Sequence, residues 1–128
     1  MAVPSVATYS TQAKIDAHTA LLALVDSGTA GSVKLRSSAD ALLCTITLTD
    51  PAGSVNGSTG QLTLTQAATV NATATGNVAY AELCDSAGTV HLALPAQQGT
   101  APVSGKFVMN TLAVVSGGPV DLLSMVIG

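Results

Sequence analysis

The spacing of apolar residues divides the chain into a helical part and a longer part with an alternating pattern. From residue 10 to residue 27, apolar side chains recur about every 3.6 positions. Ser10 or Thr11 can cap the start of this segment, and Gly28 follows its end as a natural stop. The pattern predicts one α-helix over residues 10–27. Its apolar stripe is expected to contain Ile15, Leu22 and Val25, with Leu21 and Leu24 beside them.

After Gly28 apolar and polar residues alternate, which is the period of a half-buried β-strand. In the segment ALLCTITLT, residues 41–49, one side is expected to face a core and the other to carry Leu43 and three threonines. The core side consists of Leu42, Cys44, Ile46 and Leu48. Strands are predicted at residues 32–37, 41–49, 60–66, 68–74, 77–84, 89–94, 106–115 and 119–127. Short strands separated by turn-rich segments predict a β-sandwich or barrel, not a parallel α/β sheet.

Composition narrows the class of protein. The 128 residues are 48% hydrophobic and only 9% charged, and their mean hydropathy is +0.51, so the chain is not typical of a disordered protein. The net charge is −3, and the four basic residues form no run, which argues against nucleic-acid binding. No apolar run approaches the length of a membrane span, and the first residues do not resemble a secretion signal. We expect synthesis in a cytoplasm and no membrane or nucleic-acid partner.

The residues that could carry chemistry do not form a recognisable motif. Cys44 and Cys84 fall on predicted strands, where free cysteine behaves as a small hydrophobe, and their spacing matches no zinc site. His18 and His91 are expected to be surface or interface side chains. The aspartates are expected to stabilise turns; they are Asp50, Asp85 and Asp121. We therefore expect no catalytic, metal or cofactor site.

Several segments nevertheless resemble a known class of protein. In order, they are the helix YSTQAKIDAHTALLALVDSG, then SVKLRSS, TLTDPAG and the hairpin ATATGNVAYAELCDSAGTV. They resemble small virion structural proteins of tailed bacteriophages, and most of all capsid cement, or decoration, proteins. The resemblance implies an antiparallel β-sandwich of jelly-roll type, with an extended N-terminal arm and one N-terminal helix. We expect one domain over residues 1–128, divided into the arm (1–9), the helix (10–27) and the sandwich (31–128).

The resemblance also implies a function without catalysis. Such a protein binds the outside of a phage capsid, stabilises the lattice of capsomers and has the major capsid protein as its partner. It would be located on the virion surface after synthesis in the bacterial cytoplasm. Two alternatives remain: another β-module of the particle (tail, fibre-base or head-fibre) that contacts the host, and a hydrolase or sugar-binding enzyme. The enzyme is disfavoured because the chain has no Trp to stack on a sugar.

Three segments are expected to make the contacts. A strand face of threonines suits close approach to another β surface, and few long charged side chains means little rotamer entropy to lose. The C-terminal segment has more apolar residues than one strand face needs, so we expect it to be shared with a second copy in a dimer or trimer. The arm is expected to order against a neighbouring subunit. The expected interface residues are Val3, Val6, Tyr9, Thr45, Thr47, Thr49, Leu122, Met125 and Ile127.

Overall fold

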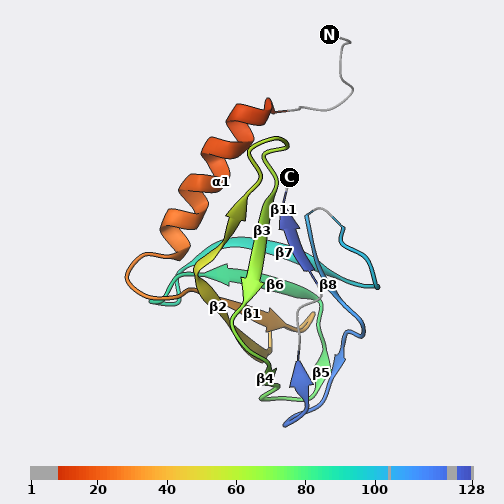
Figure 1. Cartoon of the computed structure of the whole chain (residues 1–128). Coiled ribbons are helices and arrows are strands. Elements are labelled where there is room, and N and C mark those ends of the chain that lie inside the picture. Colours follow the sequence, from red (N-terminus) through yellow and green to blue (C-terminus); the bar gives the residue numbers. More distant parts are fainter. Residues whose placement is uncertain (1–8, 104, 121–123, 128) are drawn as a thin grey trace.

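The structure is a computed structural model that describes residues 9–103, 105–120 and 124–127. The described chain is mainly β with one α-helix, and seven strands close into a barrel (Figure 1). The barrel strands are β1 (Ser32–Arg36), β2 (Leu42–Val55), β3 (Leu62–Gln66), β6 (Tyr80–Cys84), β7 (Val90–Gln98), β8 (Lys106–Met109) and β11 (Ser124–Ile127). Around the barrel their order is β1-β2-β3-β11-β8-β7-β6.

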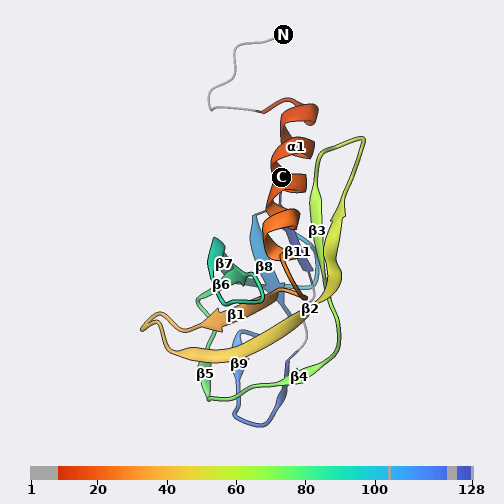
Figure 2. The ribbon, with the colours of Figure 1, turned by 90° about the vertical axis from the view of Figure 1, so that its left-hand side faces the viewer.

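Two small sheets lie at one end of the barrel, at the bottom of Figures 1 and 2. One pairs β4 (Val70–Asn71) with β10 (Pro119–Val120), and the other pairs β5 (Gly76–Asn77) with β9 (Ala113–Val114). Every predicted strand range therefore contains a strand in the structure. The ranges 77–84, 106–115 and 119–127 are each divided between a barrel strand and a small sheet.

The expected sandwich is corrected to a closed barrel. Closure follows from β11, which pairs with β3 on one side and with β8 on the other, so no edge strand is left in the barrel. The expected antiparallel order also has one exception, because β7 and β8 run parallel, with Ala96 opposite Phe107.

The core fills the barrel with aliphatic side chains and a single aromatic ring. Alternate residues point inward in β1, in β3 and over residues 44–48 of β2, as the alternating pattern predicts. The largest fully buried side chains include Phe107, Leu35, Ile46, Leu48, Leu62, Leu83 and Met125. Both cysteines are free and buried, as expected.

One part of the predicted β2 face is wrong. Leu42 is 40% exposed, and Leu43, which was expected on the outer side, is only 2% exposed. The reason is an irregularity in the pairing with β1, where Leu35 is opposite Cys44 but Arg36 is opposite Leu42. Leu43 is the extra residue of this bulge, which turns its side chain inward. Beyond the bulge the expected alternation is restored.

The expected end of this strand at Asp50-Pro51 is also corrected, since β2 bends there and continues to Val55. Its pairing with β3 is interrupted between Leu48 and Gly53, so Pro51, which has no N–H, lies where the ladder is broken. Gly53 is required at this point because a Cβ there would lie 2.0 Å from the carbonyl oxygen of Thr63. In Figure 2 the curve of β2 carries the chain from the small sheets to the side of the helix.

Helix α1 (Thr11–Val25) begins and ends close to the predicted limits. The Ser10 hydroxyl accepts a hydrogen bond from the Ala13 N–H, so of the two candidate caps Ser10 is the N-cap. The helix lies along the β2–β3 hairpin and projects beyond the barrel (Figure 1). Of its residues only Val25 is fully buried, and Leu24 is exposed, so the predicted apolar stripe is covered only in part.

Specific contacts fix this helix at its C-terminal end and at its middle. Near its C-terminus Val25 packs against Gly31, and the carboxylate of Asp26 accepts the N–H of Ala52 at 3.0 Å. At its middle the Nδ1 atom of His18 lies 2.6 Å from the carbonyl oxygen of Gly60, at the tip of the hairpin. His18 is therefore a half-buried contact between helix and hairpin instead of a surface imidazole.

Candidate docking surface

The expected threonine surface is present on the outside of the barrel. Thr45 and Thr47 on β2 are exposed, and they alternate with the buried side chains of Cys44, Ile46 and Leu48. The strand forms this surface because β-branched residues favour an extended backbone and the inward positions are apolar. Both threonines lie beside β1, where Thr45 is opposite Lys34 and Thr47 is opposite Ser32.

The neighbouring strand β3 enlarges this surface with two residues that were not among the expected interface residues. Thr63 and Thr65 are exposed, and they alternate with the buried Leu62 and Leu64. Thr63 lies opposite Ser54 of β2. The signal was present in the sequence as the alternating segment LTLT at residues 62–65. We call Thr45, Thr47, Thr63 and Thr65 the threonine face.

Thr49 has a different position from the other predicted threonines. It is half-buried at the bend of β2, and its hydroxyl donates a hydrogen bond to the carbonyl oxygen of Pro51 at 2.8 Å. A hydroxyl that is engaged in this way stabilises the bend and is less available to a partner. Thr49 therefore contributes to local structure at the margin of the threonine face.

The threonine face is uncharged and its hydroxyls are not used within the chain. From Ala41 to Ala81, a range that contains all four threonines, the sequence has a single charged residue, Asp50 at the bend of β2. Within the described residues, the four hydroxyls of this face form no hydrogen bond to another protein group. In the isolated chain, water satisfies them, and a partner surface can replace that water with its own polar groups.

The adjoining surface of β1 and β6 is charged and internally paired. Arg36 forms an ion pair with Glu82, and the Tyr80 hydroxyl donates to the carboxylate of Asp40 at 2.7 Å. The hydrogen bond to Glu82 raises the pKa of Arg36, and the hydrogen bond to Asp40 raises the pKa of Tyr80. These groups are thus held in their protonated forms and bound to partners within the chain. We call Arg36, Asp40, Tyr80 and Glu82 the charged face, and Lys34 of β1 lies beside it.

Asp85 and His91 form a second polar contact at the β6–β7 hairpin. His91 Nε2 lies 3.0 Å from Asp85 Oδ2, and Asp85 Oδ1 accepts the N–H groups of Ala87 and Thr89. The bond to His91, followed by those from the backbone, holds the pKa of Asp85 below its ordinary value. The expected turn-stabilising role of Asp85 is confirmed. His91 is mostly buried and belongs to this turn, and Asp121 lies outside the described residues.

The remaining groups to consider are metal-ligand side chains and the two thiols of the described chain. No group of three or more His, Cys, Asp or Glu side chains there could hold a metal ion. Burial raises the pKa of both thiols, Cys44 and Cys84, which favours their unreactive protonated form. Among the described residues, no helix is long and apolar enough to cross a membrane.

The other expected interface residues have diverse positions. Val3, Val6 and Leu122 lie outside the described residues. Tyr9 is 76% exposed, whereas Met125 is completely buried and Ile127 packs against the core. Met125 thus helps to fill the chain's own barrel, because β11 closes it. Met125 therefore has no surface for a partner, and this part of the expected interface is corrected.

Comparison of the chain with models of protein families, with curated proteins and with solved structures gives no match.

Proposed function

We propose that this protein is a cement, or decoration, protein that docks on the outside of a bacteriophage capsid and stabilises its lattice by binding alone. The observation that carries the proposal is the threonine face, which is exposed, uncharged and unpaired within the described chain. The resemblance of the helix, strand and hairpin segments to cement proteins supports it. A relation of the barrel to the jelly-roll folds of such proteins is part of the proposal.

Repetition over a lattice makes such a surface effective. Each copy is small and its threonine face offers a modest contact area, so one contact is weak. Many contacts on a symmetric shell add through effective concentration, particularly when copies associate with each other. Threonine also has few rotamers to lose, so ordering this face against a partner costs little conformational entropy.

The test is to place charge on the threonine face. Thr45→Lys with Thr47→Lys would bury unpaired ammonium groups at the proposed interface, which costs about 3 kcal/mol or more. We expect binding to shells assembled without the protein to fall by more than about 100-fold, measured by co-sedimentation. The matched control is Thr19→Lys with Thr89→Lys, which adds the same charge at exposed sites on α1 and the β6–β7 turn.

Equal binding by the two double variants would contradict docking through the threonine face. A second measurement tests the function itself. Particles that lack the protein should assemble but break at a lower temperature than complete particles. If they are equally heat-stable and instead lose attachment to the host, the protein is a host-contacting module of the particle.

A further inference from the structure

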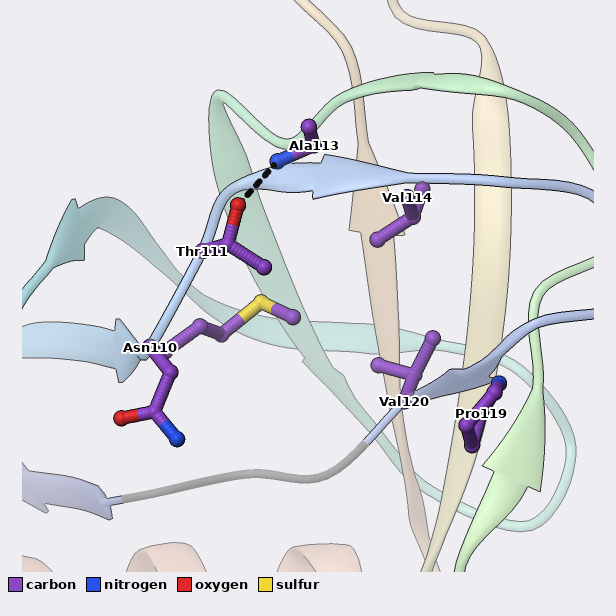
Figure 3. Close-up of a pocket in the computed structure, with 7 residues that line it drawn as sticks. Asn110, Thr111, Ala113, Val114, Pro119 and Val120 are labelled. Atoms are coloured by element: carbon purple, nitrogen blue, oxygen red, sulfur yellow. Dashed lines mark hydrogen bonds between the residues drawn. The ribbon is translucent and has the colours of Figure 1, made fainter.

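A pocket of about 200 Å³ opens at the end of the molecule that carries the small sheets (Figure 3). It lies between β9 and β10, which follow each other in the chain but do not pair with each other. β9 pairs with β5, and β10 pairs with β4, so β9 and β10 are held apart by their different partners. In Figure 3 the side chains of Val114 and Val120 point toward one another across this gap.

The pocket has an apolar floor and a polar rim. Its floor is formed by Met109, Val114 and Val120, which are buried, and its rim includes Asn110 and Thr111, which are exposed. The sequence has no charged residue from Phe107 to Val120. A cavity of about 150 Å³ holds a benzene-sized molecule. This pocket therefore suits one or two small aliphatic groups on an uncharged, extended segment, with Asn110 available to hydrogen-bond its backbone.

We propose that the occupant is residues 2–8 of a second copy of this chain. That segment, AVPSVAT, carries no charged side chain and presents valines at positions 3 and 6 with a proline between them. Proline fixes its own backbone near the polyproline conformation, so the segment loses less entropy when it is bound in extended form. Valine and the proline ring are small aliphatic groups of the size that the pocket takes.

The reach of the segment excludes its own pocket. Val3 is six residues from Tyr9, so it lies within about 21 Å of that residue. Helix α1, with 15 residues, is about 22 Å long. Tyr9 precedes its N-terminus, which is the end away from the barrel. The small sheets, whose strands β9 and β10 line the pocket, lie at the opposite end of the barrel from the helix in both views (Figures 1 and 2). Val3 can reach back along the helix but cannot cross the barrel, so only another copy's pocket is accessible.

This placement restricts how copies can associate. Tyr9, from which the segment extends, and the small sheets are at opposite ends of the molecule, so each contact joins the helical end of one copy to the small sheets of the next. Copies must then follow one another head to tail, in a ring or chain, or form an antiparallel pair with two reciprocal contacts. Parallel packing side by side is excluded. The contact forms between copies in solution and does not depend on docking to a shell.

Disulfide crosslinking between separately prepared variants tests the contact. Val6→Cys is mixed with Asn110→Cys under mild oxidation, and the control mixture pairs Val6→Cys with Thr63→Cys on the threonine face. The native cysteines are completely buried and remain in place. We expect a covalent 6–110 heterodimer at more than about ten times its yield in the control, because an occupied pocket places the two sulfurs within bonding distance.

Three outcomes would overturn the proposal. The first is a yield of the 6–110 heterodimer no higher than that of the control mixture, and the second is a main product that joins two copies of Val6→Cys. The third is a crosslink of Asn110→Cys to a shell protein alone when particles are added. Filling the pocket gives an independent measurement. Thr111→Trp, at a rim position whose side chain points toward the gap in Figure 3, should shift the protein to monomer in sedimentation velocity. Ala93→Trp, on the exposed outside of β7, should leave the oligomer unchanged. An unchanged oligomer in a folded Thr111→Trp variant would also count against it.

Discussion

The threonine face and the charged face are neighbours on one barrel, yet they satisfy their polar groups in opposite ways. On the charged face, Arg36 is bound to Glu82 and Tyr80 to Asp40. On the threonine face, one strand away, the hydroxyls are left to solvent within the described part of the chain. Thr45 and Lys34, which lie opposite each other on β2 and β1, mark the boundary.

The difference indicates which surface is complete without a partner. A charged group that already has its partner gains little from a second contact, and removing it from water is costly. A hydroxyl that is bound only to water can exchange that water for a partner's polar group at little cost. The charged face is therefore suited to remain in solvent, and the threonine face is the surface that association can cover.

The largest expected effect on the free energy of unfolding comes from substitutions in the core beneath the two faces, because both faces rest on the same core. Ile46, beneath the threonine face, and Leu35, beneath the charged face, are both fully buried. Ile46→Ala and Leu35→Ala should each lower the free energy of unfolding by about 2–5 kcal/mol, since each leaves a cavity in the same core. Urea denaturation followed by circular dichroism measures this. A loss below about 1 kcal/mol for either variant would show that one side of the barrel is not packed as described.

A smaller effect on stability, which depends on pH, is expected at the paired polar groups Asp85 and His91. The folded state holds the pKa of Asp85 below its unfolded value, so this carboxylate stabilises the fold above pH of about 4. That stabilisation is lost as the pH falls through the lowered pKa. Asp85→Asn should therefore be less stable than the natural chain at pH 7, and the difference should shrink as the pH falls below about 4.

Thermal unfolding between pH 2 and pH 7 measures this difference. The matched control is Asp50→Asn, which changes an exposed aspartate at the bend of β2. The control should follow the natural chain more closely than Asp85→Asn over the whole range. An Asp85→Asn curve parallel to that of the natural chain would contradict a stabilising role for the hydrogen bonds to His91, Thr89 and Ala87.

The smallest effect is expected on the threonine face itself. Thr47→Val and Thr63→Val keep the branched shape that suits a strand and remove only a hydroxyl that bonds to water. Each should change the free energy of unfolding by less than about 0.5 kcal/mol. The same urea experiment checks this, and Thr49→Val, which removes the hydrogen bond to Pro51, is the informative control. If Thr47→Val were as costly as Thr49→Val, the Thr47 hydroxyl would have a structural role.

The local features of this protein could be predicted from the order of its residues. Alternation with a period of two depends only on neighbouring residues, so it located every strand range and the outward direction of Thr45 and Thr47. The helix could be predicted because its signals are also local. They are its periodicity, Ser10 as one of two candidate N-caps and Gly28 as the stop. The absence of charge between residues 51 and 81 is likewise a property of the amino-acid sequence alone.

The features that depend on which distant strands pair could not be predicted in this way, because they arise when the chain folds. Closure through β11 buried Met125, and a bulge opposite β1 turned Leu43 inward against the local alternation. Pairing of β2 with β3 joined Thr63 and Thr65 to the predicted threonines, and separate partners for β9 and β10 opened the pocket. Periodicity specifies which way a side chain points along its own strand. It does not specify the neighbouring strand, because that choice depends on how all the strands share one core.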